Sequence, residues 1–164
     1  MKITIRPYTI DDANAILEII NYNIVNATAL YDYNERTLQT QIAMFEDKSS
    51  KGFPILIAIE NDIVVGFGYY SEFRFREAYK FTVEHSVYAH QNHIGKGIGK
   101  ILLEELIIIA QKQNLHTMVA VIDSENQGSI AFHEKFGFKI VGNIKESAYK
   151  FDRWLHSIIM QKML

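Results

Sequence analysis

The chain has 164 residues, of which 48% are hydrophobic and 22% are charged, and its formal net charge is -2. This length is typical of one domain with one core, so we expect residues 1–164 to form a single domain. The small net charge argues against a global field for nucleic acid or an anionic membrane, and the lack of cysteine excludes a disulfide framework, a thiolate metal site and a cysteine nucleophile.

The histidines and the apolar stretches indicate no metal and no membrane partner. None of the six histidines pairs with another at the spacing of a known zinc motif, so we expect no metal site. Residues 1–15 lack the continuous apolar segment of a signal peptide, and the apolar run 106–110 is too short to span a bilayer. We therefore expect a cytoplasmic protein.

The first elements read as one strand followed by two helices. Residues 2–7 alternate polar and apolar like a short strand, and residues 9–25 have helical periodicity. Thr9 and Asp12 match a capping box at the start of that helix. Residues 35–47 predict a second, shorter helix.

Three strand patterns follow, and a glycine loop comes after them. Residues 55–60 and 63–70 are β-rich, and Asn61-Asp62 between them is a hairpin signal. A polar stretch separates them from a third strand over 80–89, which leads directly into the loop.

A helix after the loop precedes the last predicted strands. Its expected apolar face consists of Ile98, Ile101, Leu102, Leu106 and Ile109. Residues 117–122 are nearly all apolar, which indicates an interior strand. Residues 128–138 predict a short helix that Gly137 ends, and residues 139–164 predict two more strands.

This order of elements predicts an α/β fold with a mixed sheet. Three consecutive strands form an antiparallel meander, and a helical crossover after the loop requires a parallel partner for the third of them. We expect helices on both faces of the sheet.

The loop around Gly95 fits neither of the two common phosphate-binding motifs. A dinucleotide fingerprint needs glycine at the sixth position, where Lys100 stands. A P-loop needs Ser or Thr after Gly-Lys, but Lys96 precedes Gly97. The remaining alternatives are another anion site, formed by backbone amides at a helix N-terminus, and a tight turn with solvated lysines.

The blocks "GKGIGKILLEEL" and "NQGSIAFHEKFGF" together resemble the GNAT family of acetyl-CoA-dependent N-acetyltransferases. In that family the first block binds the pyrophosphate of acetyl-CoA, and its two motif glycines correspond here to Gly97 and Gly99. The family's leading Arg or Gln corresponds to Ile94, which leaves most of the binding to backbone amides. The resemblance implies the GNAT fold, with about seven mostly antiparallel strands and one central parallel pair.

Further blocks narrow the resemblance. "TVEHSVYAH", "SIAFHEKFGF", "YKFDRWLHSIIMQ" and "FPILIAIENDIVVGFGYY" are similar to the phosphinothricin and methionine sulfoximine/sulfone acetyltransferases. This resemblance implies transfer of acetyl from acetyl-CoA to the amine of a small amino-acid-like molecule, in a protein that forms homodimers. Other acceptors (a polyamine, an aminoglycoside, a protein N-terminus) stay open, as does a non-catalytic acyl-CoA sensor.

Two residues are candidates for acid and base chemistry. Glu84 matches the subfamily's proposed base, which would take a proton from the attacking amine, although a carboxylate in this strand can also face solvent. His133 occupies the position where many relatives carry a tyrosine that protonates the leaving thiolate, but a lone histidine on a helix is often structural. His85 should face the opposite side of the strand from Glu84 and have a structural role.

The resemblance also implies a set of acetyl-CoA contacts. A strand should bind the pantetheine arm through its backbone, a loop should hold the pyrophosphate, and an asparagine should contact the cofactor or cap a helix. These residues are Val87, Tyr88 and Ala89 on the strand, Gly95, Lys96, Gly97, Ile98, Gly99 and Lys100 in the loop, and Asn126.

The acceptor pocket should come from the first two helices and from the segment "EFRFREAY". An arginine there can bind the carboxylate of an amino-acid-like acceptor, unless these arginines are simply solvated. The candidates are Tyr31, Phe73, Arg74, Arg76, Glu77, Ala78 and Tyr79.

Overall fold

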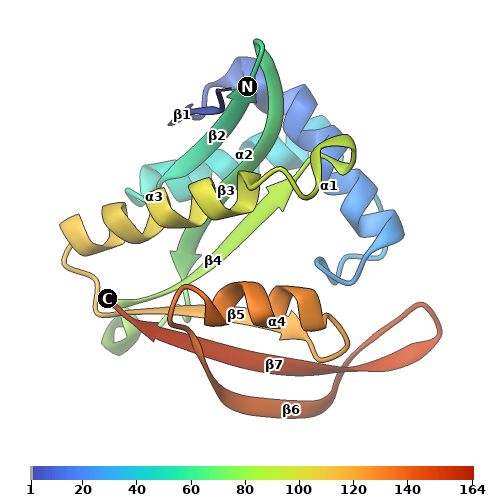
Figure 1. The fold of residues 1–164 in the computed structure, drawn as a ribbon, viewed down its shortest axis with the longest axis vertical. Coiled ribbons are helices and arrows are strands. Elements are labelled where there is room, and N and C mark those ends of the chain that lie inside the picture. Colours follow the sequence, from blue (N-terminus) through green and yellow to red (C-terminus); the bar gives the residue numbers. More distant parts are fainter. Residues whose placement is uncertain (1) are drawn as a thin grey trace.

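The computed structural model describes residues 2–164 and contains a twisted mixed sheet with two helices on each face (Figure 1). The strands are β1 (Thr4–Pro7), β2 (Ile55–Glu60), β3 (Ile63–Glu72), β4 (Thr82–Ala89), β5 (Thr117–Asp123), β6 (Lys139–Lys150) and β7 (Arg153–Met163). The helices are α1 (Ala13–Asn26), α2 (Leu38–Ser50), α3 (Ile98–Lys112) and α4 (Gln127–Glu134), and short 3-10 turns lie at Ile10–Asp12, Glu77–Tyr79 and Gln91–His93.

The seven strands are ordered β1-β2-β3-β4-β5-β7-β6 in the sheet. Neighbouring strands are antiparallel except for β4 and β5, which are parallel and joined through the crossover helix α3. The predicted mixed sheet with one central parallel pair is therefore confirmed.

Alternation along the strands assigns the helices to opposite faces. On β2, Ile55 and Ile57 pack with the buried isoleucines of α1 and with Phe45 of α2. Leu56 and Ala58 point the other way and pack with α3 and α4. Because successive strand side chains point to opposite faces, these two clusters form two separate core layers.

The hairpin turn between β2 and β3 is as predicted. Asn61 and Asp62 both have positive φ, 52° and 62°, which suits the two-residue turn that matches the twist of the strands. At the first helix, the Asp12 carboxylate accepts hydrogen bonds from the Thr9 amide at 2.9 Å and the Thr9 hydroxyl at 3.2 Å, so the two predicted capping residues are in contact.

The observed helices differ from the predictions in the bounds of α2 and in the buried face of α3. α2 runs over 38–50 instead of 35–47, because Thr37 caps it by accepting a hydrogen bond from the Thr40 amide at 3.1 Å. On α3, Ile101 and Ile109 lie at the edge of the apolar face and are only half-buried. The buried residues of that helix are Ile98, Leu102, Leu103, Leu106, Ile107 and Ala110.

Two glycines of β3 let α3 approach the sheet. A Cβ on Gly66 would lie 2.6 Å from Ile98 Cγ2 and 2.7 Å from the Tyr88 carbonyl oxygen. A Cβ on Gly68 would lie 2.9 Å from Val87 Cγ1 and 3.2 Å from Leu106 Cδ1. The first turn of α3 is thus held directly against β3 and β4, next to the glycine loop.

Candidate active site

The parallel pair separates after a short distance, and this separation creates a cleft. β4 and β5 pair at three positions, ending with Glu84 opposite Val119. Beyond that point β4 stays paired with β3 up to Ala89, and β5 stays paired with β7 up to Asp123. The two strands diverge in Figure 1, and residues 85–89 and 120–123 line a cavity of about 610 Å³ between them.

The glycine loop closes one side of this cavity. Gly95 and Gly97 have φ of 83° and 80°, the left-handed region, and apart from each glycine and its two chain neighbours no heavy atom of residues 2–164 lies within 4 Å of a Cβ built on either one. α3 begins at Ile98, so its first backbone amides lack helical partners and face the loop. Amides at a helix N-terminus with open space in front of them can bind a phosphate group.

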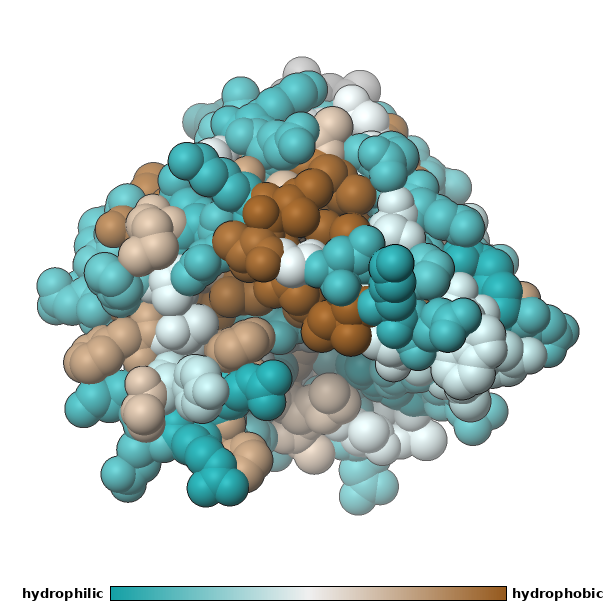
Figure 2. Space-filling model, turned by 90° about the horizontal axis from the view of Figure 1, so that it is seen from below, coloured by the Kyte–Doolittle hydropathy of each residue, from teal (hydrophilic) through white to brown (hydrophobic). Residues whose placement is uncertain are grey.

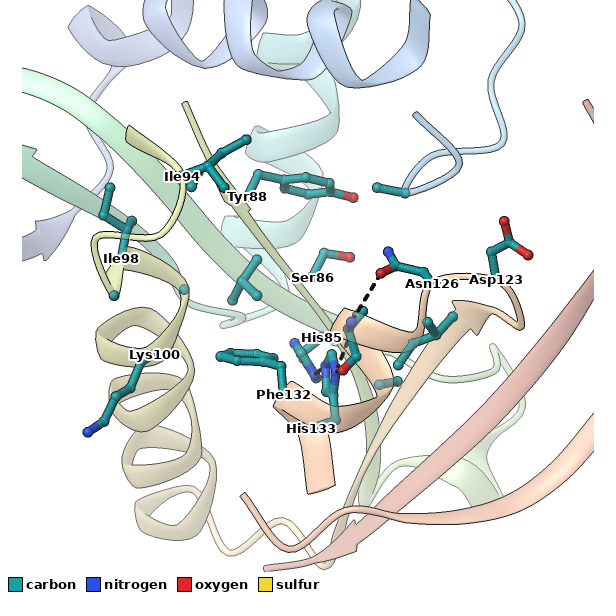
Figure 3. Close-up of a pocket in the computed structure, with 18 of the residues that line it drawn as sticks. His85, Ser86, Tyr88, Ile94, Ile98, Lys100, Asp123, Asn126, Phe132 and His133 are labelled. Atoms are coloured by element: carbon teal, nitrogen blue, oxygen red, sulfur yellow. Dashed lines mark hydrogen bonds between the residues drawn. The ribbon is translucent and has the colours of Figure 1, made fainter. Parts of the chain in front are cut away.

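The side chains of the loop differ in their direction. Residues 93–95 and 97–100 line the cavity, whereas Lys96 does not. Lys100 lies at the cavity wall (Figure 3). Its Nζ is 3.8 Å from Glu104 Oε1. Ile94, which replaces the resembling family's Arg or Gln, is 71% exposed at the cavity rim and offers no hydrogen-bond donor from its side chain.

Strand β4 supplies the long wall of the cavity. Val87, Tyr88 and Ala89 line it where the edge of β4 that faces β5 has no strand partner. An extended molecule with amide groups can therefore add to this edge as another strand would. This geometry suits the pantetheine arm of acetyl-CoA.

Glu84 lies immediately before the separated part of β4, on the face covered by α1 and α2. It shares this face with Ser86 and Tyr88, because alternate residues of a strand point the same way. Burial raises the pKa of the Glu84 carboxyl above its ordinary value, and the Lys48 ammonium opposes this increase. A carboxylate with a raised pKa is better matched to accepting a proton near neutral pH.

His85 and His133 form a buried pair on the opposite face. His85 points away from Glu84, as strand alternation predicts, and its Nε2 lies 3.1 Å from His133 Nε2 (Figure 3). His133 Nδ1 lies 2.7 Å from the carbonyl oxygen of Ser129. Burial lowers the pKa of both rings, that of His85 to about 3, so both are neutral at pH 7.

The contacts of the pair define the proton positions. A carbonyl oxygen only accepts, so His133 Nδ1 carries the proton and its Nε2 is an acceptor. His85 must then donate from Nε2, which leaves its buried Nδ1 without a hydrogen-bond partner among the described residues. Both nitrogens of His133 are engaged within the protein, and this favours a positioning role over proton donation.

Asn126 caps helix α4 at the cavity wall. Its Oδ1 accepts a hydrogen bond from the Ser129 amide at 3.0 Å, and the residue also lines the cavity. The capping interpretation is thus compatible with a cofactor contact through the free side-chain nitrogen.

The predicted acceptor residues lie outside this cavity. Phe73 and Tyr79 pack edge to face at 5.9 Å between ring centroids, and the Arg74 guanidinium lies 5.3 Å from the Phe73 centroid. Arg74, Arg76, Glu77, Ala78, Tyr79 and Tyr31 are exposed. The base of this loop is close to Glu84 along the chain, since the Phe73 amide donates to the Thr82 carbonyl at 3.3 Å.

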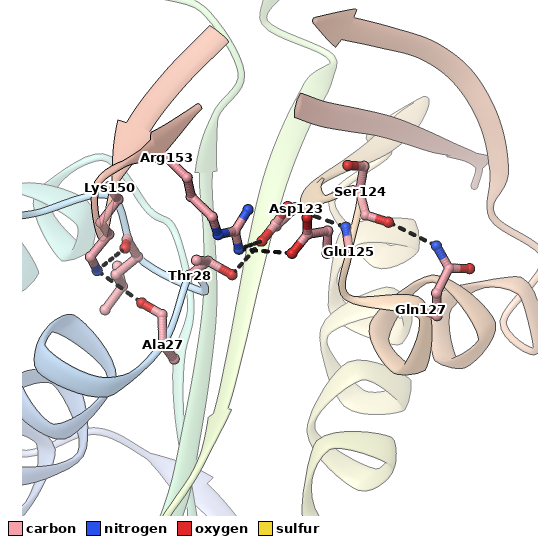
Figure 4. Close-up of polar contacts among 9 residues, drawn as sticks. Ala27, Thr28, Asp123, Ser124, Glu125, Gln127, Lys150 and Arg153 are labelled. Carbon is pink, nitrogen blue, oxygen red and sulfur yellow. Dashed lines mark hydrogen bonds and ion pairs between the residues drawn. The ribbon is translucent and has the colours of Figure 1, made fainter. Parts of the chain in front are cut away.

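Thr28 and Ala29, in the segment between α1 and α2 that completes the cavity, were not among the residues that the sequence predicted for the site. Thr28 and Ala29 line the cavity wall, and the Thr28 hydroxyl donates to Asp123 Oδ2 at 2.7 Å (Figure 4). Arg153 donates to the same carboxylate at 3.2 Å. Lys150 Nζ donates to the carbonyl oxygens of Ala27 at 2.8 Å and Leu30 at 2.6 Å.

Asp123 is ionised in this arrangement. Burial alone would raise its pKa, but hydrogen bonds from Thr28, from the Glu125 amide and from Arg153 outweigh burial and hold the pKa below its ordinary value. The cavity residues that sequence analysis did not single out also include Ser86 of β4, residues 120–122 of β5, and Ser129 and Phe132 of α4. The signal for them was weak, because each is defined by contacts between segments far apart in the chain.

Residues 2–164 form neither a cluster of metal-binding side chains nor a membrane-spanning helix. No three His, Asp or Glu side chains in this part of the chain converge to hold a metal ion. No helix formed by these residues is both long and apolar enough to cross a membrane.

A cavity between diverging parallel strands, with an anion-binding loop at a helix N-terminus, is the arrangement of a transferase that takes an acyl group from acyl-CoA. Residues 19–138 match the sequence profile of the Acetyltransferase (GNAT) family. The chain belongs to this family, and it is an acetyltransferase whose co-substrate is acetyl-CoA.

Three similar proteins illustrate the relationship. The L-methionine sulfoximine/L-methionine sulfone acetyltransferase of Salmonella typhimurium is 38% identical over 155 residues, covering 93% of this chain and 90% of that protein. An L-amino acid N-acyltransferase of Escherichia coli is 37% identical over 153 residues, covering 93% of this chain and 89% of that protein. A phosphinothricin acetyltransferase of Sinorhizobium meliloti, solved in complex with acetyl-CoA, has a TM-score of 0.97 at 34% identity, covering 100% of this chain and 89% of that one.

Proposed function

We propose that this protein transfers acetyl from acetyl-CoA to the α-amino group of a small amino-acid-like acceptor, of the methionine sulfoximine, methionine sulfone or phosphinothricin type. The observation that carries the proposal is the position of Glu84, half-buried on β4 where this strand separates from β5. The relatives that act on such acceptors cover nearly the whole chain, which supports the choice of substrate class.

In the proposed reaction the amine attacks acetyl-CoA directly in a ternary complex. An α-amino group with a pKa of about 8 is mostly protonated at neutral pH, so Glu84 takes its proton. The amine nitrogen then bonds to the thioester carbonyl carbon, and the C–S bond breaks with its electron pair on the sulfur. The nitrogen loses a second proton, the thiolate takes up a proton, and the products are the amide and the thiol of CoA. The chain has no cysteine, so no acetyl-cysteine intermediate forms.

The remaining site residues have binding roles in this proposal. Backbone groups of Val87, Tyr88 and Ala89 bind the pantetheine arm, and an amide there polarises the thioester carbonyl. The amides of the loop from Gly95 to Lys100 hold the pyrophosphate. His133 supports the cavity wall next to acetyl-CoA and does not protonate the leaving thiolate.

A thiol-release assay with acetyl-CoA tests the proposal against its alternatives. The acceptor panel contains amino acids, methionine sulfoximine and sulfone, phosphinothricin, a polyamine, an aminoglycoside and a peptide with a free N-terminus. Turnover restricted to the carboxylated amino-acid analogues, with intersecting double-reciprocal plots, is the expected result. Parallel plots contradict direct attack, and binding of acetyl-CoA without turnover of any amine indicates a sensor.

Replacing Arg74 and Arg76 together by methionine should raise the KM of a carboxylated acceptor by about tenfold or more. The reason is that a hydrogen-bonded charged pair contributes roughly 1.5–3 kcal/mol. The KM of acetyl-CoA should stay unchanged, and so should the KM of an amine that lacks a carboxylate. An equal effect on both kinds of acceptor would show that the arginines do not bind the carboxylate.

We also propose that the protein acts in the cytoplasm as a homodimer of single-domain chains that pairs through β6. β6 is an edge strand of the sheet, yet Ile140, Val141 and Ile144 on it are more than half exposed. Figure 2, which views the molecule from the side of β6 and β7, shows a hydrophobic patch enclosed by hydrophilic surface. Contiguous exposed apolar surface on an edge strand is typical of an interface.

Sedimentation equilibrium should give twice the mass of one chain. Replacing Ile140 and Ile144 by lysine should give the mass of one chain, because two charges would then stand in the apolar contact. A dimer that survives this change would place the interface elsewhere.

A further inference from the structure

A buried carboxylate at the end of β2 contacts the glycine loop and has no part in the proposed reaction. Glu60 is 5% exposed. Its Oε2 lies 3.2 Å from His93 Nδ1 and 3.5 Å from Lys96 Nζ, and Lys96 Nζ lies 3.3 Å from His93 Nδ1. We call Glu60, His93 and Lys96 the loop anchor.

The loop anchor compensates a charge that would otherwise be costly. A buried carboxylate is destabilising unless it is paired or hydrogen-bonded. Both side chains that pair with Glu60 belong to the segment between β4 and α3, so the pairing ties this segment to the turn end of the β2–β3 hairpin. The tie joins parts of the chain more than thirty residues apart.

The segment needs such a tie because its own sequence restrains it weakly. Gly95 and Gly97, on either side of Lys96, both have left-handed backbones and open space around them. Glycine has more backbone freedom than any other residue, so a loop that must present its amides in one geometry loses entropy when a ligand binds. A contact that fixes the loop beforehand removes part of this cost.

The direction of Lys96 agrees with this role. Its neighbours on both sides line the cavity, whereas Lys96 does not, and its Nζ lies 3.5 Å from Glu60 Oε2. Lys96 is therefore held by a carboxylate instead of being available to a phosphate. The sequence interpretation that placed Lys96 among the phosphate-binding residues differs from this geometry.

We propose that Glu60 is a positioning residue for acetyl-CoA, which holds the loop through Lys96 and His93 so that the backbone amides meet the pyrophosphate. This inference rests on the proposal that the loop binds the pyrophosphate. The two possible effects of the Glu60 charge on acetyl-CoA affinity have opposite signs. If the charge only kept Lys96 from the phosphates or repelled them, removing it would strengthen binding of acetyl-CoA. If Glu60 positions the loop, removing the charge weakens binding.

The test compares two acetyl donors in wild type and in Glu60→Gln. Acetyl-CoA carries the pyrophosphate, and S-acetylpantetheine carries the same thioester and arm without any phosphate. We expect Glu60→Gln to lower kcat/KM for acetyl-CoA by about tenfold through KM, with kcat at saturation and the acceptor KM unchanged. The kcat/KM for S-acetylpantetheine should be the same in both proteins.

Two further variants distinguish a loss of loop positioning from a general loss of folding. Lys96→Met should show the same selective effect, and the double variant should lose little more than either single one, since the two residues act as a unit. Asp47→Asn removes another carboxylate that pairs with a lysine, Lys51 at 2.9 Å, far along the chain from the loop. This control should leave both donors unaffected.

The outcomes separate this inference from the proposal on which it rests. If the wild type uses both donors equally well, the loop does not bind the pyrophosphate, and both statements fail. If the wild type prefers acetyl-CoA but Glu60→Gln keeps or increases that preference, the role of Glu60 is wrong, whereas the proposal that the loop binds the pyrophosphate is not contradicted. An equal loss with both donors, or with a lowered kcat, shows general damage and also overturns the role.

Discussion

Replacing Glu84 by glutamine should lower kcat by about 10²- to 10⁴-fold, the usual contribution of a positioned general base. Glutamine keeps the size and hydrogen-bonding capacity of the side chain but cannot accept a proton from the amine. Binding of acetyl-CoA, measured by calorimetry, should not change, because the cavity that holds it is lined by residues 85–89 and not by Glu84. Glu105→Gln on the exposed side of α3 is the control and should keep full activity.

The pH dependence of kcat/KM provides a second measure of the same role. A base must be deprotonated to act, so activity should fall as pH decreases through the pKa of Glu84, which burial raises above its ordinary value. Lys48 lowers this pKa, so Lys48→Met should move the acidic limb to higher pH. A Glu84→Gln variant with more than a tenth of wild-type kcat, or an acidic limb that ignores Lys48, would mean that another group is the base.

The order of elements and the direction of the strands could be predicted from local patterns. Alternating and helical periodicities are local, and the crossover helix between residues 89 and 117 requires a parallel pair. The turn between β6 and β7 gave no such signal. Phe151 and Asp152 form it with φ of 53° and 57°, although Phe seldom adopts the left-handed region.

The residues of the site likewise include some that local sequence motifs predict and others that only the folded chain brings together. The glycine loop and the β4 strand are continuous segments, so their residues could be identified from motifs. The contacts that hold them come from distant segments: Thr28 meets Asp123, and Glu60 meets Lys96. Periodicity of a single segment has no information on such pairs, because they depend on how the sheet brings separate elements together.

Strand alternation explains how β4 can present the proposed base, Glu84, on one face of the sheet and a buried structural histidine, His85, on the other. Glu84 faces α1 and α2, from which the acceptor would approach, and His85 faces α3 and α4. The sequence predicted that His85 points away from Glu84. It did not predict that His85 meets His133, because 48 residues separate the two.

The buried pair His85–His133 should make the protein lose stability in mild acid. His85 has a folded pKa of about 3, whereas an exposed histidine in the unfolded chain has a pKa of about 6.5. Above pH 6.5 both states carry a neutral ring, and His85 adds no pH dependence. Below pH 6.5 the unfolded state binds a proton that the native state does not, so the free energy of unfolding decreases as pH falls, until about pH 3.

The slope of this decrease identifies His85 when it is compared with a matched variant. Well below pH 6.5, one such histidine contributes roughly 1.4 kcal/mol per pH unit. His85→Gln retains a side-chain N–H that can donate to His133 Nε2, but it cannot titrate. Urea unfolding between pH 7 and pH 5 should therefore give a shallower decrease for His85→Gln than for wild type. Parallel decreases in the two proteins would show that His85 is protonated in the folded state, and the assignment of a neutral donor to His85 would then be wrong.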